Sequence, residues 1–93
     1  MYKIEISNAV KKDIKNLPRN IQKKIDGVFI LLSSTPEIGD TLTGEFRDYL
    51  SYHFKVSNVE YRIIYKIYKN ELVVLIILVG TRENIYKQLK RRV

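Results

Sequence analysis

The chain has 93 residues, no cysteine, one histidine and a formal net charge of +7. This length is enough for one hydrophobic core, so residues 1–93 are expected to form a single domain. The composition excludes disulfides, a thiol nucleophile and a cysteine-based zinc site, and neither a metal nor a cofactor is expected. The longest apolar run, residues 72–79, is far shorter than the roughly 20 residues that span a bilayer, and the N-terminus lacks the apolar stretch of a signal peptide. We therefore expect a cytoplasmic protein with no membrane partner.

The positive charge lies mostly in the second half of the chain. Residues 1–44 carry a net charge of +2, and residues 45–93 carry a net charge of +5. A small basic domain with this asymmetry favours a polyanionic partner, of which nucleic acid is the commonest. The alternative is that the lysines only keep the protein in solution.

The first half of the chain predicts a strand and a pair of helices. Apolar alternation over 2–6 indicates a strand. Ser7 is a suitable N-cap for a helix over 8–16, and Pro18 suits the first turn of a second helix that extends to about residue 32. Two helices joined by a tight turn make an α-hairpin. The second helix repeats apolar residues at helical spacing, and this stripe consists of Ile21, Ile25, Val28, Phe29 and Leu32.

The second half predicts three strands and a terminal helix. After a loop over 33–44, strands are expected over about 47–57, 59–69 and 71–81, with breaks between them that are too short for a crossover helix. These strands must therefore be sequential antiparallel neighbours, and residues 83–93 close the chain as a short helix. The order βααβββα predicts a two-layer α+β domain, in which an antiparallel sheet carries the α-hairpin on one face.

Side-chain alternation separates the two faces of this predicted sheet. The apolar face, which the α-hairpin would cover, consists of Leu50, Tyr52, Phe54, Val56, Tyr61, Ile63, Tyr65 and Ile67. The opposite face collects His53, Lys55, Arg62 and Lys66. We expect these cations to form an open basic floor beside Arg82 and the last helix.

Each of these residues also has a purely structural explanation. Lys66 would be an ordinary solvated strand residue, and His53 would be a structural histidine. Arg62 would be stacked on aromatic rings or paired with a glutamate such as Glu60. Tyr86 would fill the core.

Longer stretches of the sequence resemble a known family. The segment "LTGEFRDYLSYHFKVSNVEYRIIYKI", followed by "LVGTRENIY", resembles the RelE/ParE superfamily of bacterial and archaeal toxin–antitoxin toxins. The segment "AVKKDIKNLPRNIQKKI" is similar to the helix hairpin of that family. The resemblance covers almost the whole chain, and its most specific parts are "YRIIY" and "GTRENIY". It implies a small antiparallel sheet with a helical hairpin on one face, in agreement with the fold predicted above.

Members of the family differ in function, so the branch has to be inferred from individual site residues. RelE-like toxins cut mRNA in the ribosomal A site with strand cations, an arginine after the last strand and an aromatic residue in the final helix. The matching residues of this chain are His53, Lys55, Arg62, Arg82 and Tyr86. ParE-like toxins, which poison DNA gyrase, generally lack this set. The resemblance therefore implies the RelE-like branch.

What the resemblance implies is a ribosome-dependent, metal-independent endoribonuclease. The 2′-OH of RNA would attack the adjacent phosphorus, and the protein would accept its proton, stabilise the added charge and protonate the leaving oxygen. Either His53 or Lys55 would be the base, because the best-known member has a lysine where this chain has His53. Arg62 and Arg82 would hold the phosphate, and Tyr86 would stack on a base or orient the 2′-OH. Further RNA contacts are expected from Arg47, Lys66, Lys87, Lys90 and Arg91.

The expected partners are the ribosome with its mRNA and a cognate antitoxin. Operator DNA would be contacted only through the antitoxin. Two alternatives are a ParE-like gyrase inhibitor without nuclease activity and a non-toxic RNA-binding or antitoxin-buffering module. We expect an antitoxin segment to cover Arg62 and Arg82 or to displace the last helix. The apolar anchorage of that helix is little more than Ile85 and Leu89, and three cations in its tail should repel one another.

Overall fold

Five strands form one sheet in the order β1-β5-β4-β3-β2, in a computed structural model that describes residues 1–93. The strands are β1 (Lys3–Ile6), β2 (Asp40–Thr41), β3 (Leu50–Val56), β4 (Val59–Tyr68) and β5 (Val73–Thr81). The antiparallel pairing of β3, β4 and β5 confirms the predicted meander. β1 pairs parallel with β5, however, so the sheet is mixed and the expectation of a wholly antiparallel sheet is wrong at this edge. Tight turns force sequential strands to be antiparallel, but no turn joins β1 to β5.

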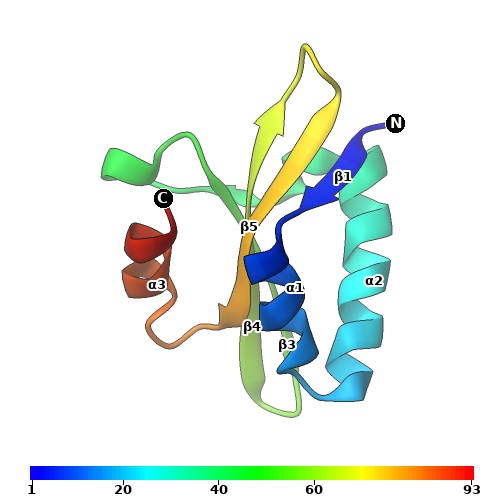
Figure 1. Ribbon diagram of the computed structural model, residues 1–93, viewed down its shortest axis with the longest axis vertical. Helices are drawn as coiled ribbons and strands as arrows, with labels where there is room; N and C mark the ends of the chain where they lie inside the picture. Colours follow the sequence, from blue (N-terminus) through cyan, green and yellow to red (C-terminus); the bar gives the residue numbers. More distant parts are fainter.

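The helices lie on both sides of this sheet (Figure 1). The α-hairpin of α1 (Asn8–Lys15) and α2 (Arg19–Ser34) covers one face, and α3 (Ile85–Arg92) lies against the other. The predicted N-cap is confirmed, because the N–H of Val10 donates to Ser7 Oγ at 3.2 Å. Pro18 is the N-cap of α2 rather than a residue of its first turn. No helix is both long enough and apolar enough to cross a membrane.

The segment predicted as a plain loop contains structure of its own. Two short 3₁₀ helices, Pro36–Ile38 and Gly44–Phe46, flank the two-residue strand β2, which pairs antiparallel with β3. Neither apolar alternation nor helical spacing marks elements this short, so the sequence pattern missed them. The predicted strand over 47–57 also begins later, at Leu50, because the second 3₁₀ helix and a turn precede it.

The two faces of the sheet bury separate apolar clusters. Under the α-hairpin, twelve buried residues pack together: Val10, Ile21, Ile25, Val28, Leu32, Phe54, Tyr61, Ile63, Tyr65, Val74, Ile76 and Val79. The β3 and β4 residues of this cluster are among those that alternation assigned to the apolar face. Under α3, a smaller cluster is formed by Leu42, Ile64, Leu78, Ile85 and Leu89. The cationic face is therefore not open, because α3 covers its middle.

A bulge in β5 explains why that strand is apolar on both parities. Ile64 pairs with Leu78, but the next residue, Tyr65, pairs with Ile76, so Ile77 is the extra residue of β5. One extra residue exchanges the faces of all residues beyond it. Leu78 consequently packs under α3 although Ile76, two residues earlier, packs under the α-hairpin.

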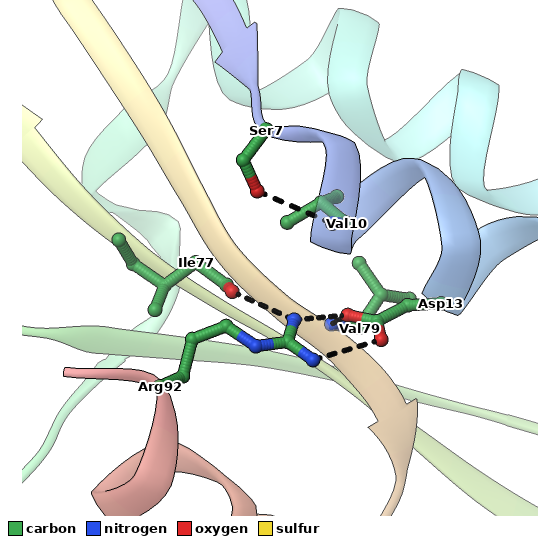
Figure 2. Close-up of polar contacts among 6 residues, drawn as sticks. All are labelled: Ser7, Val10, Asp13, Ile77, Val79 and Arg92. Atoms are coloured by element: carbon green, nitrogen blue, oxygen red, sulfur yellow. Dashed lines mark hydrogen bonds and ion pairs between the residues drawn. The ribbon is translucent and has the colours of Figure 1, made fainter.

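An ion pair between the two helical layers closes the outer edge of β5 beyond the bulge (Figure 2). β1 pairs with β5 only as far as Ile76. Past that point Asp13 Oδ2 of α1 accepts the N–H of Val79 at 3.1 Å, and Arg92 Nη1 of α3 donates to the carbonyl of Ile77 at 3.2 Å. Arg92 and Asp13 also form two hydrogen bonds with each other, at 2.6 and 3.1 Å. These side chains satisfy the strand edge as a neighbouring strand would.

This ion pair corrects the sequence-based view of the last helix. Ile85 and Leu89 are buried, as predicted. The tail, however, is not held away by repulsion among its cations, because Arg92 bonds to Asp13 and to β5. α3 thus has a polar anchor at its C-terminal end in addition to its two apolar anchors.

Candidate functional site

Arg62 is the centre of the basic group on the α3 side of the sheet. Its backbone lies between His53 of β3 and Gly80 of β5, which are its partners in the two strand pairs. The Nε of Arg62 donates to Glu60 Oε2 at 2.9 Å, and Nη1 donates to the Tyr86 hydroxyl at 2.8 Å. The guanidinium is therefore held by a strand carboxylate on one side and by a helix phenol on the other.

The Glu60–Arg62 contact fixes the charge of both groups. The hydrogen bond from Arg62 lowers the pKa of the Glu60 carboxyl, and the charges of Arg62, Arg82 and His53 lower it further against the opposing effect of burial. Partial burial by itself would lower the pKa of Arg62, but the hydrogen bond to Glu60 and the neighbouring Tyr86 outweigh it and raise that pKa. Arg62 is thus a permanent cation with a fixed orientation.

A cleft of about 520 Å³ opens beside Arg62, and we call it the Arg62 cleft. Its lining residues are Asp40, Thr41, Leu42, Thr43, Phe46, Ser51, His53, Arg62 and Tyr86. Three of the five predicted catalytic residues, His53, Arg62 and Tyr86, therefore share one cavity. The side chain of His53 is half exposed, so its imidazole is accessible from solvent.

The other two predicted catalytic residues lie in a second cavity of about 350 Å³, the Arg82 hollow. Its lining residues are Lys55, Asn58, Val59, Glu60, Thr81, Arg82 and Glu83. Lys55 is opposite Glu60 across the β3–β4 pair, and the backbone N–H of Arg82 donates to the Glu60 carbonyl at 2.9 Å. Glu60 and Arg62 are adjacent on one face of β4, so they separate the two cavities.

The predicted RNA-contact residues do not line either cavity. Lys66 lies four residues from Arg62, about 13 Å along β4, and its ammonium is over the rings of Tyr49 and Tyr68. Arg47 donates to the carbonyl of Gly44 at 3.4 Å. The three cations of α3 in the prediction, Lys87, Lys90 and Arg91, are exposed on that helix. No group of three or more histidine, aspartate or glutamate side chains is arranged to hold a metal ion.

Comparison with family models identifies the chain. Residues 4–90 match the model of the ParE-like toxins of type II bacterial toxin–antitoxin systems. The chain belongs to this toxin family. No curated protein matches it in sequence.

Several solved structures similar to this ParE-like toxin are RelE toxins. The toxin–antitoxin complex RelBE2 of Mycobacterium tuberculosis is similar with a TM-score of 0.78 and 25% identity, over 87% of this chain and 98% of that chain. A mutant of Escherichia coli RelE in the free state has a TM-score of 0.77 and 16% identity, over 98% and 92% of the two chains. For the archaeal RelE–RelB complex of Pyrococcus horikoshii the values are 0.64 and 24%, over 88% and 96%. The toxin accordingly has the RelE-like fold, as the sequence resemblance implied.

Sequence reasoning missed several residues of the two cavities. Glu60 was considered only as a possible partner of Arg62, although its i−2 position on the same strand face already places it in the site. Asp40 and Phe46 lie in the segment whose short elements were not predicted. Ser51 also lines the Arg62 cleft, and it is buried with a hydroxyl that has no hydrogen-bond partner.

Proposed function

We propose that this toxin is a ribosome-dependent endoribonuclease that cleaves mRNA in the A site and so inhibits translation. The observation that supports this most is the convergence of His53, Arg62 and Tyr86 on the Arg62 cleft. A proton acceptor and a fixed cation are two of the groups that cleavage of RNA by its own 2′-OH requires, and an aromatic side chain can stack on a base or orient the 2′-OH. The excess of positive charge in the second half of the chain favours an RNA substrate.

In the proposed reaction the 2′-oxygen bonds to the adjacent phosphorus and the bond from phosphorus to the 5′-oxygen breaks. His53 takes the proton of the 2′-OH, and Arg62 stabilises the charge that develops on the phosphoryl oxygens. The leaving 5′-oxygen receives a proton from Lys55 in the Arg82 hollow, because an arginine does not release its proton. The products are a 2′,3′-cyclic phosphate and a 5′-hydroxyl. No step in this scheme uses a metal ion.

The division into two cavities supports His53 over Lys55 as the base. His53 shares its cavity with Arg62 and Tyr86, whereas Lys55 shares one with Arg82. A phosphate held between the cavities by Arg62 and Arg82 would therefore have the imidazole on one side and the ammonium on the other. The ribosome would supply substrate alignment, a contribution worth several kcal/mol.

Primer extension on a reporter mRNA after induction of the toxin tests this proposal. Cuts inside translated codons are expected, and they should disappear when translation is blocked. Arg62→Ala should reduce cleavage by about 100-fold to 1000-fold, the usual effect of removing one charge-stabilising donor. The matched control is Lys24→Ala, which removes an exposed cation of α2 on the opposite side of the sheet. Equal activity of wild type and Arg62→Ala would overturn the assignment.

The second candidate is a gyrase inhibitor without nuclease activity, which the ParE-like family description favours. It predicts gyrase–DNA cleavage complexes and no mRNA cuts in the same induced cells. Comparing the two readouts in one experiment separates the candidates. A harmless wild-type protein would instead support a non-toxic binding module.

We also propose that a cognate antitoxin neutralises the toxin, since similar RelE chains occur in complexes with RelB. Tyr86 is carried by α3 and bonds to Arg62, so an antitoxin that displaces α3 would remove one wall of the Arg62 cleft. One that covers Arg62 and Arg82 would block both cavities. Hydrogen exchange of residues 83–93 with and without the antitoxin distinguishes these two modes. Unchanged protection of residues 83–93 in the complex, with Arg62 and Arg82 still exposed, would contradict both modes. Operator DNA would be reached only through the antitoxin.

A further inference from the structure

One carboxylate projects into the Arg62 cleft beside the imidazole. Asp40 Oδ2 lies 3.5 Å from Nδ1 of His53, which is the only histidine of the chain. Both residues line the cleft together with Arg62 and Tyr86. Stability alone does not explain this carboxylate next to the histidine, because exposed ion pairs contribute little to stability.

The backbone that carries Asp40 is fixed from the core. The strand β2 pairs with β3, and Asp40 is opposite Ser51. Just before β2, the N–H of Gly39 donates to the hydroxyl of Tyr65 at 3.0 Å, and that hydroxyl donates to the carbonyl of Pro36 at 2.6 Å. Tyr65 is completely buried. A side chain at position 39 would collide with the Tyr65 hydroxyl, so glycine is required at this close approach.

The backbone of the other member of the pair is held by the sheet. His53 lies inside β3, and its strand partner on β4 is Arg62. Asp40 approaches the imidazole at Nδ1, which leaves Nε2 as the other ring nitrogen. When Nδ1 carries the proton and donates it to a carboxylate, Nε2 has a free lone pair and accepts protons.

We propose that Asp40 is a positioning residue for His53, which holds the imidazole as the Nδ1–H tautomer with Nε2 available as the proton acceptor. This inference rests on the proposed function for its catalytic consequence, but the tautomer itself does not depend on activity. The separation of 3.5 Å is slightly longer than a typical hydrogen bond, but the negative charge of the carboxylate already favours a proton on the nearer ring nitrogen.

Nitrogen-15 NMR of the single imidazole tests the pair directly. At a pH where His53 is neutral, the wild-type protein should show the Nδ1–H tautomer. Asp40→Ala should shift the population toward the Nε2–H tautomer that free histidine favours, and Asp40→Glu should restore Nδ1–H. Asp48→Ala, which removes an exposed carboxylate of the same segment, should leave the spectrum unchanged. A wild-type spectrum dominated by Nε2–H would overturn the inference whether or not the protein cuts RNA.

Single-turnover cleavage on programmed ribosomes tests the consequence. Asp40→Ala should lower the maximal rate by about 10-fold to 100-fold without weakening ribosome binding, as loss of an orienting partner usually does. In a His53→Ala background the same change should have no further effect, because Asp40 acts through the imidazole. A full effect in that background, or a change in codon preference at unchanged rate, would show that Asp40 contacts the RNA and would overturn the inference. Wild-type protein that cuts no RNA would refute the proposed function and leave the NMR result to decide the pair.

Discussion

The same strands build both faces of the sheet, but the two faces have different roles. The face under the α-hairpin stabilises the fold, and the face under α3 lines the cavities. Ile63, on the hairpin face of β4, is completely buried in a twelve-residue apolar cluster. Its neighbour Arg62 points to the other face and bonds to Glu60 and Tyr86. Alternation along one strand thus separates residues that stabilise the fold from residues that line the cavities. Substitutions on the two faces should therefore differ in kind as well as in size.

The largest expected effect is on the hairpin face. Ile25 of α2 is fully buried in the twelve-residue cluster, so Ile25→Ala should lower the free energy of unfolding by about 2–5 kcal/mol through lost burial and a residual cavity. Ile30, on the same helix, is 69% exposed, and Ile30→Ala should change the free energy by less than about 0.5 kcal/mol. Urea unfolding followed by circular dichroism measures both. Similar losses in the two variants would mean that the exposed side of α2 is also part of the core.

Tyr65 connects the two faces, and Tyr65→Phe tests that connection. Removing the hydroxyl leaves the Pro36 carbonyl and the Gly39 N–H without their partner, which should cost about 1–3 kcal/mol of unfolding free energy. Because this loop leads into Asp40, we also expect the His53 imidazole to lose its preferred tautomer. Tyr68→Phe, which alters a more exposed ring of the same strand, is the control.

The same hydroxyl should make stability depend on alkaline pH. Burial raises the pKa of Tyr65 above its ordinary value of 10.0. Above that pH the unfolded chain loses this proton while the folded chain keeps it, so unfolding becomes more favourable. The stability advantage of wild type over Tyr65→Phe should therefore be constant below pH 10 and shrink above it. An advantage that grows with pH would contradict the burial of the protonated phenol.

The parts of the fold that the sequence predicts are those marked by long periodic patterns of apolar residues. The α-hairpin, the meander and the two faces of β3 and β4 follow from periodicity over many residues. The parallel pairing of β1 with β5 does not, because no connection constrains it. The bulge at Ile77 lies in an uninterrupted apolar run. Because every residue of that run is apolar, a shift of the pairing by one residue does not change the alternation of polar and apolar residues.

The candidate site shows the same limit. Strand parity placed His53 and Arg62 on one face, and the family resemblance implied Tyr86, whereas Asp40 depends on a two-residue strand that a buried tyrosine holds in place. The two cavities meet at Glu60 and Arg62, which bond to each other and line one cavity each. The anchor of α3 depends on Asp13 and Arg92, which are 79 residues apart in sequence. Contacts over such separations leave no local signal.

That anchor gives the next prediction, because it belongs to neither apolar cluster. Arg92→Ala removes the donor to Ile77 and the partner of Asp13, and it should reduce the stability of α3 against local opening by about 1–2 kcal/mol. Hydrogen exchange of residues 85–92 should quicken accordingly, while exchange of α2 stays unchanged. Arg91→Ala, which removes an exposed cation from the adjacent position, should have no such effect. Equal exchange in both variants would mean that Ile85 and Leu89 hold the helix without the ion pair.

The smallest expected effect concerns the ion pair between the two cavities. The pKa of Glu60 is lowered below its ordinary value of 4.5, chiefly by the hydrogen bond from Arg62. The folded chain therefore loses this proton more readily than the unfolded chain does, so the contribution to stability is present above pH 4.5 and is lost as the pH falls through the lower folded pKa. Glu60→Gln keeps an acceptor for Arg62 but cannot titrate.

The free energy of unfolding of wild type minus that of Glu60→Gln should thus be constant near neutral pH and should decrease in acid. Because the pair lies at the surface of two open cavities, the change should be small compared with those at Ile25 and Tyr65. A difference that increases toward low pH would mean that Glu60 binds its proton more tightly in the folded protein, and the orientation of Arg62 would then need another cause.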